Sequence, residues 1–63
     1  MQTFTTFEQV HKSGKGEGFL KGRKASVLVP HVNRYCLKVY RKTGTRPTYT
    51  LEQTSTGVVV RFA

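Results

Sequence analysis

A single cysteine, Cys36, constrains this 63-residue chain more than any other feature. One thiol cannot form an intrachain disulfide, and it cannot complete a Cys/His ligand set for a structural zinc ion. The two histidines, His11 and His31, also lack the paired spacing of a zinc site. A chain of this length buries only about 60% of the surface that it exposes when unfolded. We therefore expect one domain, residues 1–63, with a thin core and with neither a metal nor a cofactor.

Two segments near the C-terminus alternate polar and apolar residues with the period of a β-strand. They are residues 48–52 and residues 58–62, and the turn-forming residues 54–57 lie between them. This pattern predicts an antiparallel hairpin. The side chains expected on its buried face are Tyr49, Leu51, Val58, Val60 and Phe62.

The N-terminal region predicts a short helix. Thr5 and Glu8 fit a capping box, Phe7 and Val10 have the spacing of an inward helical face, and Gly14 ends the pattern. Residues 13–24 then contain four glycines and four Lys or Arg residues, with only two large apolar residues. We expect a flexible loop there, with at most one short strand.

The middle of the chain is open to two interpretations. Residues 25–29 are apolar and rich in valine, and Pro30 closes this run, which predicts a strand that ends at the proline. Residues 32–42 fit helical spacing through Val32, Cys36 and Val39, and they fit strand spacing through Tyr35, Leu37 and Val39. Their content of Val, Tyr and Cys favours the strand.

These segments predict an α+β fold in which a short N-terminal helix packs on a three- to four-stranded antiparallel β-meander. The alternative is a helix over residues 31–42 that is followed by the C-terminal hairpin. That order of elements resembles winged-helix DNA-binding modules, and the resemblance concerns element order alone.

The charge of the chain predicts a negatively charged partner. Eleven Lys and Arg residues face three Glu residues, which gives a net charge of +8 and a field that attracts polyanions. Nucleic acid, DNA or RNA, is the first expectation, and an acidic protein surface is the second. No apolar run approaches 20 residues, so we expect no membrane insertion. Residues 1–12 lack the pattern of a signal peptide, and the lone thiol suits a reducing compartment, so we expect a cytoplasmic, intracellular protein.

The basic residues provide the candidate binding site. As a strand, the middle segment would place Arg34, Lys38 and Tyr40 on one surface, where cations neutralise phosphates and the tyrosine stacks on a base. As a helix, it would place Arg34, Lys38, Arg41 and Lys42 on one exposed face. The candidate nucleic-acid-binding residues are Arg34, Lys38, Tyr40, Arg41, Lys42, Arg46, Lys15, Lys21, Arg23 and Lys24.

Catalytic patterns are missing from the sequence. There is no Asp, and no two of the three Glu residues are placed in sequence to act as an acid and a base. The glycine-rich residues 13–18 resemble a phosphate loop in composition, but they lack its spacing and follow a helix instead of a strand. We therefore predict a nucleic-acid-binding protein that is not an enzyme. The alternative is a small effector, such as a virus-encoded accessory protein, that binds an acidic protein partner and inhibits or modulates it.

Overall fold

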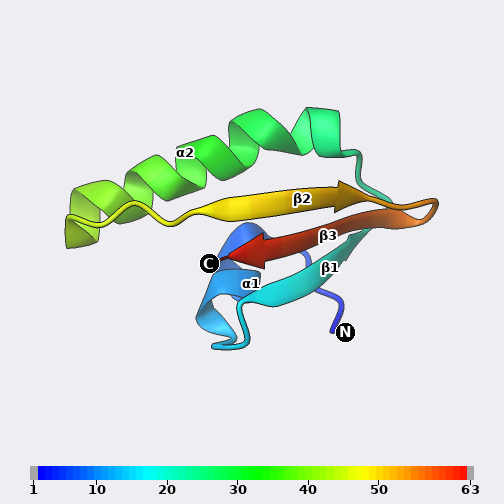
Figure 1. The fold of residues 1–63 in the computed structure, drawn as a ribbon, viewed down its shortest axis with the longest axis horizontal. Coiled ribbons are helices and arrows are strands. Elements are labelled where there is room, and N and C mark those ends of the chain that lie inside the picture. Colours follow the sequence, from blue (N-terminus) through cyan, green and yellow to red (C-terminus); the bar gives the residue numbers. More distant parts are fainter. Residues whose placement is uncertain (1, 63) are drawn as a thin grey trace.

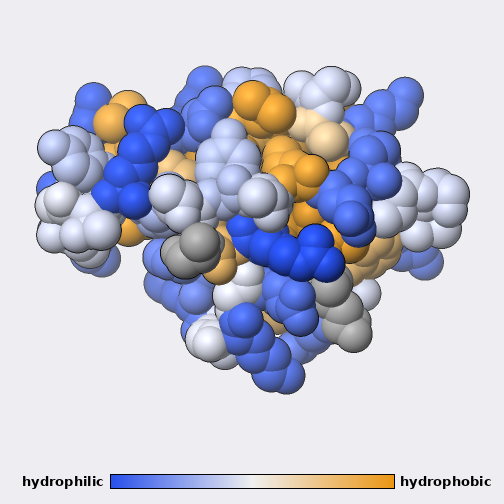
Figure 2. All heavy atoms as spheres, viewed as in Figure 1, coloured by the Kyte–Doolittle hydropathy of each residue, from blue (hydrophilic) through white to orange (hydrophobic). Residues whose placement is uncertain are grey.

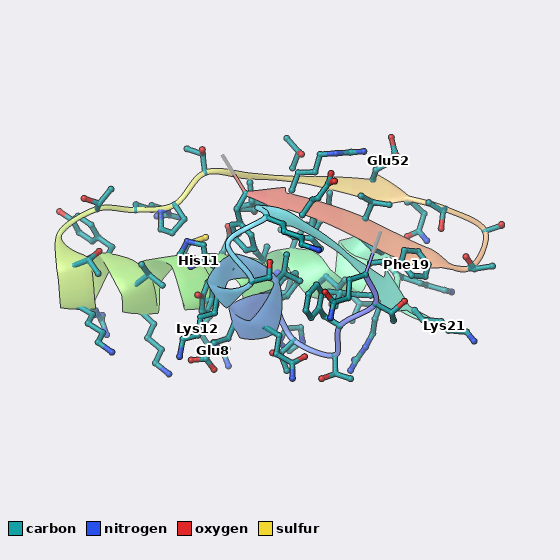
Figure 3. The ribbon with its side chains drawn as sticks, turned by 90° about the horizontal axis from the view of Figure 1, so that it is seen from below. Glu8, His11, Lys12, Phe19, Lys21 and Glu52 are labelled. Atoms are coloured by element: carbon teal, nitrogen blue, oxygen red, sulfur yellow. The ribbon has the colours of Figure 1, made fainter. Side chains whose placement is uncertain are left out.

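Two helices and a three-stranded antiparallel sheet make up residues 2–62, which a computed structural model describes (Figure 1). The elements are α1 (Phe7–Lys12), β1 (Glu17–Lys21), α2 (Ala25–Thr43), β2 (Tyr49–Gln53) and β3 (Gly57–Phe62). Both helices lie on one side of the sheet, as the view from below shows (Figure 3). The predicted α+β class with an antiparallel sheet is therefore confirmed.

The C-terminal hairpin forms as predicted. β2 pairs antiparallel with β3, with Thr50 opposite Arg61 and Leu51 opposite Val60. The turn is held by Thr54, whose amide donates to the Gly57 carbonyl at 2.8 Å and whose hydroxyl accepts from the Gly57 amide at 3.1 Å. The side chains of Val58 and Val60 are buried on the face that the helices cover, which confirms the predicted inner face.

The glycine-rich segment contributes a full strand to the sheet. β1 lies within the range predicted as a loop with at most one short strand, and it pairs antiparallel with β3 to give the strand order β1-β3-β2. Gly18 explains why this segment packs, because a Cβ at this position would collide with the rings and methyl groups of Phe4 and Val10. The order is not that of a consecutive meander. β1 and β2 run parallel to each other at opposite edges, and α2 connects them.

Helix α1 begins one residue later than predicted. Thr6 is its N-cap, and the capping box pairs Thr6 with Gln9 instead of Thr5 with Glu8. The amide of Gln9 donates to the Thr6 hydroxyl at 3.3 Å, and the Gln9 side-chain oxygen accepts from the amides of Thr5 and Thr6. The helix ends at Lys12, before Gly14 adopts a φ of 78°, so the predicted end is confirmed.

The predicted strands at residues 25–29 and 32–42 are wrong, because both segments belong to α2. Leu28, Val32 and Cys36 recur every four residues and are all buried, so helical packing against the sheet outweighs the strand preference of the valines. Pro30 lies inside the helix and is exposed. The Ser26 carbonyl loses its helical donor there, and water can replace that donor on the exposed side.

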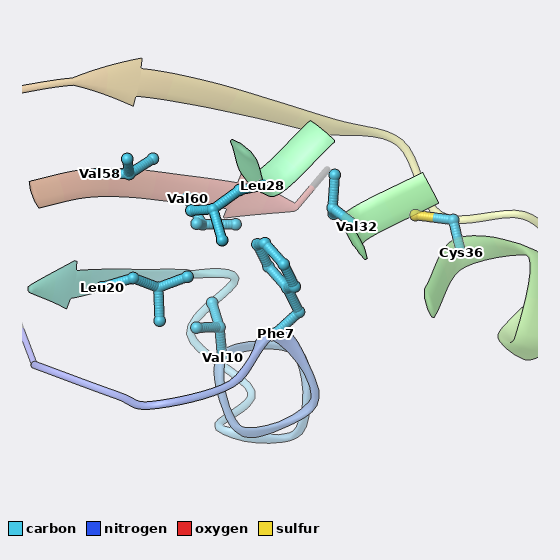
Figure 4. Packing of buried hydrophobic residues seen from close by; sticks show 8 residues of the cluster. All are labelled: Phe7, Val10, Leu20, Leu28, Val32, Cys36, Val58 and Val60. Carbon is cyan, nitrogen blue, oxygen red and sulfur yellow. The ribbon is translucent and has the colours of Figure 1, made fainter. Parts of the chain in front are cut away.

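The core lies between the helices and the inner face of the sheet (Figure 4). It is built by eight side chains: Phe7, Val10, Leu20, Leu28, Val32, Cys36, Val58 and Val60. The side chains of Val10, Val32, Cys36, Val58 and Val60 are wholly inaccessible to solvent. Tyr49, Leu51 and Phe62 pack against this cluster as half-buried neighbours. Because residues on one side of α2 are fixed in this core, the other side of the helix is exposed.

Candidate functional site

The exposed side of α2 carries a compact group of cations, which we call the basic face. It consists of Arg34, Lys38, Arg41 and Lys42, all of which are exposed. Their spacing places them within about 100° of the helix circumference, away from the buried stripe of Leu28, Val32 and Cys36. No acidic residue occurs in α2. The prediction of a shared face in the helical alternative is therefore confirmed.

The carboxylates of the protein lie away from the basic face, with one exception. Residues 18–51 contain eight of the eleven Lys and Arg residues and no acidic residue. On the outer face of the sheet, Glu17 pairs with Arg61 at 3.5 Å, and Glu52 points away from the helices (Figure 3). Lys21 lies on the same outer face, so two glutamates and two cations balance there. The excess positive charge is thus concentrated on the helical side.

Glu8 is the exception, because it lies near the edge of the basic face. Its carboxylate pairs with the Lys12 ammonium at 3.1 Å, one helical turn along α1 (Figure 3). This hydrogen bond and the charge of Lys12 lower the pKa of Glu8, and the charges of Lys38 and Lys42 add to the effect. Glu8 is therefore ionised at neutral pH and cancels about one of the nearby positive charges.

A cleft of about 350 Å³ separates α1 from the C-terminal half of α2. His11 and Tyr35 line it and form a hydrogen bond of 2.7 Å between Nδ1 and the phenol oxygen. Lys12, Lys38 and Lys42 also line the cleft, so two members of the basic face border it. Burial raises the pKa of Tyr35, and the charge of Glu8 raises it further, so the phenol stays neutral. Glu8 lines the cleft as well, so three lysines and one carboxylate surround a neutral phenol and the charge around the cleft is positive.

Cations also precede the N-terminus of α2. Arg23 and Lys24 lie about 15 Å along the helix axis from Arg34, so they lengthen the positive surface. Arg23 and His31 line a second hollow of about 290 Å³ with Leu28. Lys24 is the N-cap of α2 and makes no side-chain capping hydrogen bond.

The remaining predicted site residues lie elsewhere. Tyr40 is about 160° around α2 from Lys38, so the prediction that Arg34, Lys38 and Tyr40 share one surface is wrong. The strand pattern that placed them together does not apply to a helix. Arg46 lines a separate hollow of about 300 Å³ with His11 and Pro47. Lys15 lies between α1 and β1, and Lys21 lies on the sheet.

His11 and Tyr35 are the site residues that the sequence prediction left out. The spacing of His11 and Lys12 after Phe7 indicates their places on α1, but the approach of α1 to Tyr35 is a tertiary contact. Within residues 2–62 no three His, Cys, Asp or Glu side chains are grouped to hold a metal ion. Neither helix in this range has the length and apolar character to cross a membrane.

Comparison with family models, with curated proteins and with solved structures found no match to this chain. The geometry of the basic face and its surroundings therefore carries the functional proposal.

Proposed function

We propose that this protein binds nucleic acid through the basic face of α2, mainly by contacts to phosphates, and that it acts inside the cell as a binding protein and not as an enzyme. The observation that carries the proposal is the group of four exposed cations on one side of a helix that contains no acidic residue. Phosphate contacts of this kind supply affinity with little dependence on base sequence.

The dimensions of α2 suit this role. Its 19 residues give a rod of about 28 Å, and the major groove of B-DNA, about 12 Å wide, admits an α-helix. The order of α2, β2 and β3, a helix before a hairpin, also resembles that of winged-helix DNA-binding modules, as an analogy of element order alone.

The placement of Arg23 and Lys24 gives independent support. The N-terminus of a helix carries partial positive charge, so cations there cost stability, and no acidic residue offsets them in the first turn of α2. Local rules are most often broken where function requires it. Binding of a polyanion would give these two cations such a function.

The salt dependence of binding tests the proposal. The four phosphate contacts of the basic face contribute about −3.6 to the log-log slope for duplex DNA and about −2.8 for a single strand, to which any contact by Arg23 or Lys24 adds. Charge reversal of Arg34 and Lys38 in the variant R34E/K38E should halve the contribution of the basic face, because two of its four contacts are lost. The control K15E/K21E makes the same change in net charge away from α2. Equal weakening by both variants, or a slope near zero for the unmodified protein, would remove the proposal.

A second candidate function rests on the apolar residues of α2. The four large apolar side chains that are exposed among residues 2–62 all lie on this helix: Val27, Val29, Leu37 and Tyr40. Specific protein interfaces use apolar and aromatic anchors, which phosphate binding does not need. A small effector, for example one encoded by a virus, could dock this helix on an acidic protein and inhibit or modulate it.

Nuclease treatment separates the two candidates. If the immobilised protein retains partners from a lysate and loses all of them after nuclease digestion, nucleic-acid binding is supported. Retention of one acidic protein after digestion, with loss of that protein in a Leu37→Ser variant, supports the effector and overturns the first candidate.

A further inference from the structure

One edge of the sheet is open, and the hydrogen-bond pattern shows which groups it presents. The Thr54 amide donates to Gly57, and the paired register continues at every second residue, so Thr50 and Glu52 bond to β3. The N–H and C=O groups of Tyr49, Leu51 and Gln53 therefore point away from β3. Within residues 2–62 none of these backbone groups has a hydrogen-bond partner outside the sheet.

The opposite edge, formed by β1, is covered. The Phe19 amide donates to the Gln2 carbonyl at 3.0 Å, and the Phe4 amide donates to the Phe19 carbonyl at 2.8 Å. Sheets commonly block a free edge with lysine, proline or a bulge. Residues 49–53 contain neither lysine nor proline, and their register with β3 is continuous. The β2 edge is therefore left available for pairing.

The side of α2 that faces β2 carries exposed apolar side chains. Asn33 marks this side, because its Oδ1 accepts a 2.7 Å hydrogen bond from the Tyr49 hydroxyl. Val29, Leu37 and Tyr40 lie along the same side at intervals of three, four or eight residues and are 41%, 39% and 50% exposed. We call these three residues the apolar stripe. It is about 16 Å long, which matches about five residues of extended chain.

The stripe and the open edge are neighbours. Figure 1 shows α2 running alongside β2 and the extended segment that leads into it. Hydrophobic side chains are exposed between α2 and the strands when the sheet is viewed from its outer face (Figure 2). A strand added at β2 would place alternate side chains on the helical side, toward the apolar stripe.

We propose that the β2 edge and the apolar stripe form a strand-addition site for an extended segment of a partner protein, one with apolar residues at alternate positions and a net negative charge. The open backbone groups require an extended segment, and the stripe requires apolar side chains on one side of it. The net charge of +8, together with Arg46 next to β2, outweighs the one glutamate of β2, Glu52, so it favours an acidic partner and disfavours a second copy of this chain. The site is separate from the basic face, so it does not depend on nucleic-acid binding.

A selection from random decapeptides displayed on phage, with the full chain as bait, tests the proposal. The enriched sequences should alternate apolar residues and carry net negative charge. When a synthetic copy of an enriched peptide binds, amide exchange at Tyr49, Leu51 and Gln53 should slow by about tenfold or more, while Thr50 and Glu52, already bonded to β3, change little. Failure to enrich any sequence, or protection of none of the three amides, overturns the proposal.

Two pairs of variants locate the binding contacts. Leu51→Pro and Leu51→Ala both remove the leucine side chain, but only the proline removes the outward N–H, so peptide affinity should fall further with proline. V29S/Y40S should weaken binding by about tenfold, whereas Val27→Ser, on the opposite side of α2, should not. The exchange pattern of the unmodified protein keeps the test valid if Leu51→Pro fails to fold. If the protein forms concentration-dependent dimers that protect the same three amides, a second copy of this chain occupies the site, and the proposal of a segment from another protein is overturned.

Discussion

Replacement of Lys24 should stabilise the protein and weaken its proposed binding at the same time. Lys24 occupies the N-cap of α2 with extended backbone angles, φ −116° and ψ 135°, which suit a capping residue. The Ala25 amide already donates to the Gln53 side-chain oxygen at 2.7 Å, whereas the Ser26 amide has no hydrogen-bond partner outside the helix among residues 2–62. A serine or aspartate at position 24 can accept from Ser26 or from Val27.

The expected gain has two parts. A side-chain cap contributes about 1 kcal/mol to the free energy of unfolding, and an anion in place of a cation at the helix N-terminus adds about 0.5 kcal/mol. Lys24→Ser should provide the first part, and Lys24→Asp should provide both. A total of about 1.5 kcal/mol corresponds to a rise of about 6–12 °C in the melting temperature of a domain of this size.

Thermal unfolding followed by circular dichroism measures these effects, with Lys24→Ala as the variant that loses the charge but gains no cap. In about 1 M salt the advantage of aspartate over serine should largely vanish, because charge interactions are screened while the cap is retained. The salt slope for duplex DNA should become shallower by about 0.9 in all three variants, since one cation is lost. If neither the serine nor the aspartate variant melts above the unmodified protein, position 24 is not an unsatisfied N-cap of α2.

Three further predictions concern the core and the sheet. Gly57→Ala should cost about 2 kcal/mol of unfolding free energy in urea titrations, because the new Cβ would lie 2.8 Å from Phe19 Cζ and against the Leu20 carbonyl. Gly44→Ala, where φ is +80° and space is open, should cost about 1 kcal/mol of unfolding free energy. A larger cost for Gly44→Ala than for Gly57→Ala would contradict the packing of Phe19 over Gly57. Burial raises the pKa of the Cys36 thiol above its ordinary value, so the folded protein loses stability as the pH rises into the alkaline range where the unfolded chain ionises this thiol first. Cys36→Ala should reduce this loss, and an unchanged pH profile would contradict the prediction. Tyr49→Phe should cost about 1 kcal/mol in the same titrations, because the Asn33 acceptor loses its partner, and a neutral result would show that water replaces it.

The hairpin and α1 could be predicted from sequence because local patterns determine them. Residues 48–52 and 58–62 alternate with the pleat of a strand. The observed β2 is shifted by one residue from the first range, and β3 begins one residue before the second. The threonines before Phe7 indicate the start of a helix, although the N-cap is Thr6 and not Thr5. The choice between two adjacent threonines depends on which Glu or Gln side chain folds back, and local sequence allows both.

Helix α2 shows where local preference misleads. The valines and Pro30 favour extended chain, and a boundary at the proline hides the spacing of Leu28, Val32 and Cys36 across it. Burial of these three side chains against β3 decides the outcome, and that contact is between residues distant in sequence. The basic face was predictable only in the helical alternative. The separation of Tyr40 from Lys38 follows from helical geometry, and the approach of His11 to Tyr35 follows from tertiary packing.

The position of β3 governs the order in which this protein can be assembled during synthesis. β1 and β2 emerge from the ribosome first, yet neither neighbours the other, and each pairs only with β3. A nascent chain that ends before Gly57 therefore has no complete strand pair and leaves the inner side of α2 without its sheet. Such a chain would expose apolar surface to chaperones and proteases until the last strand arrives.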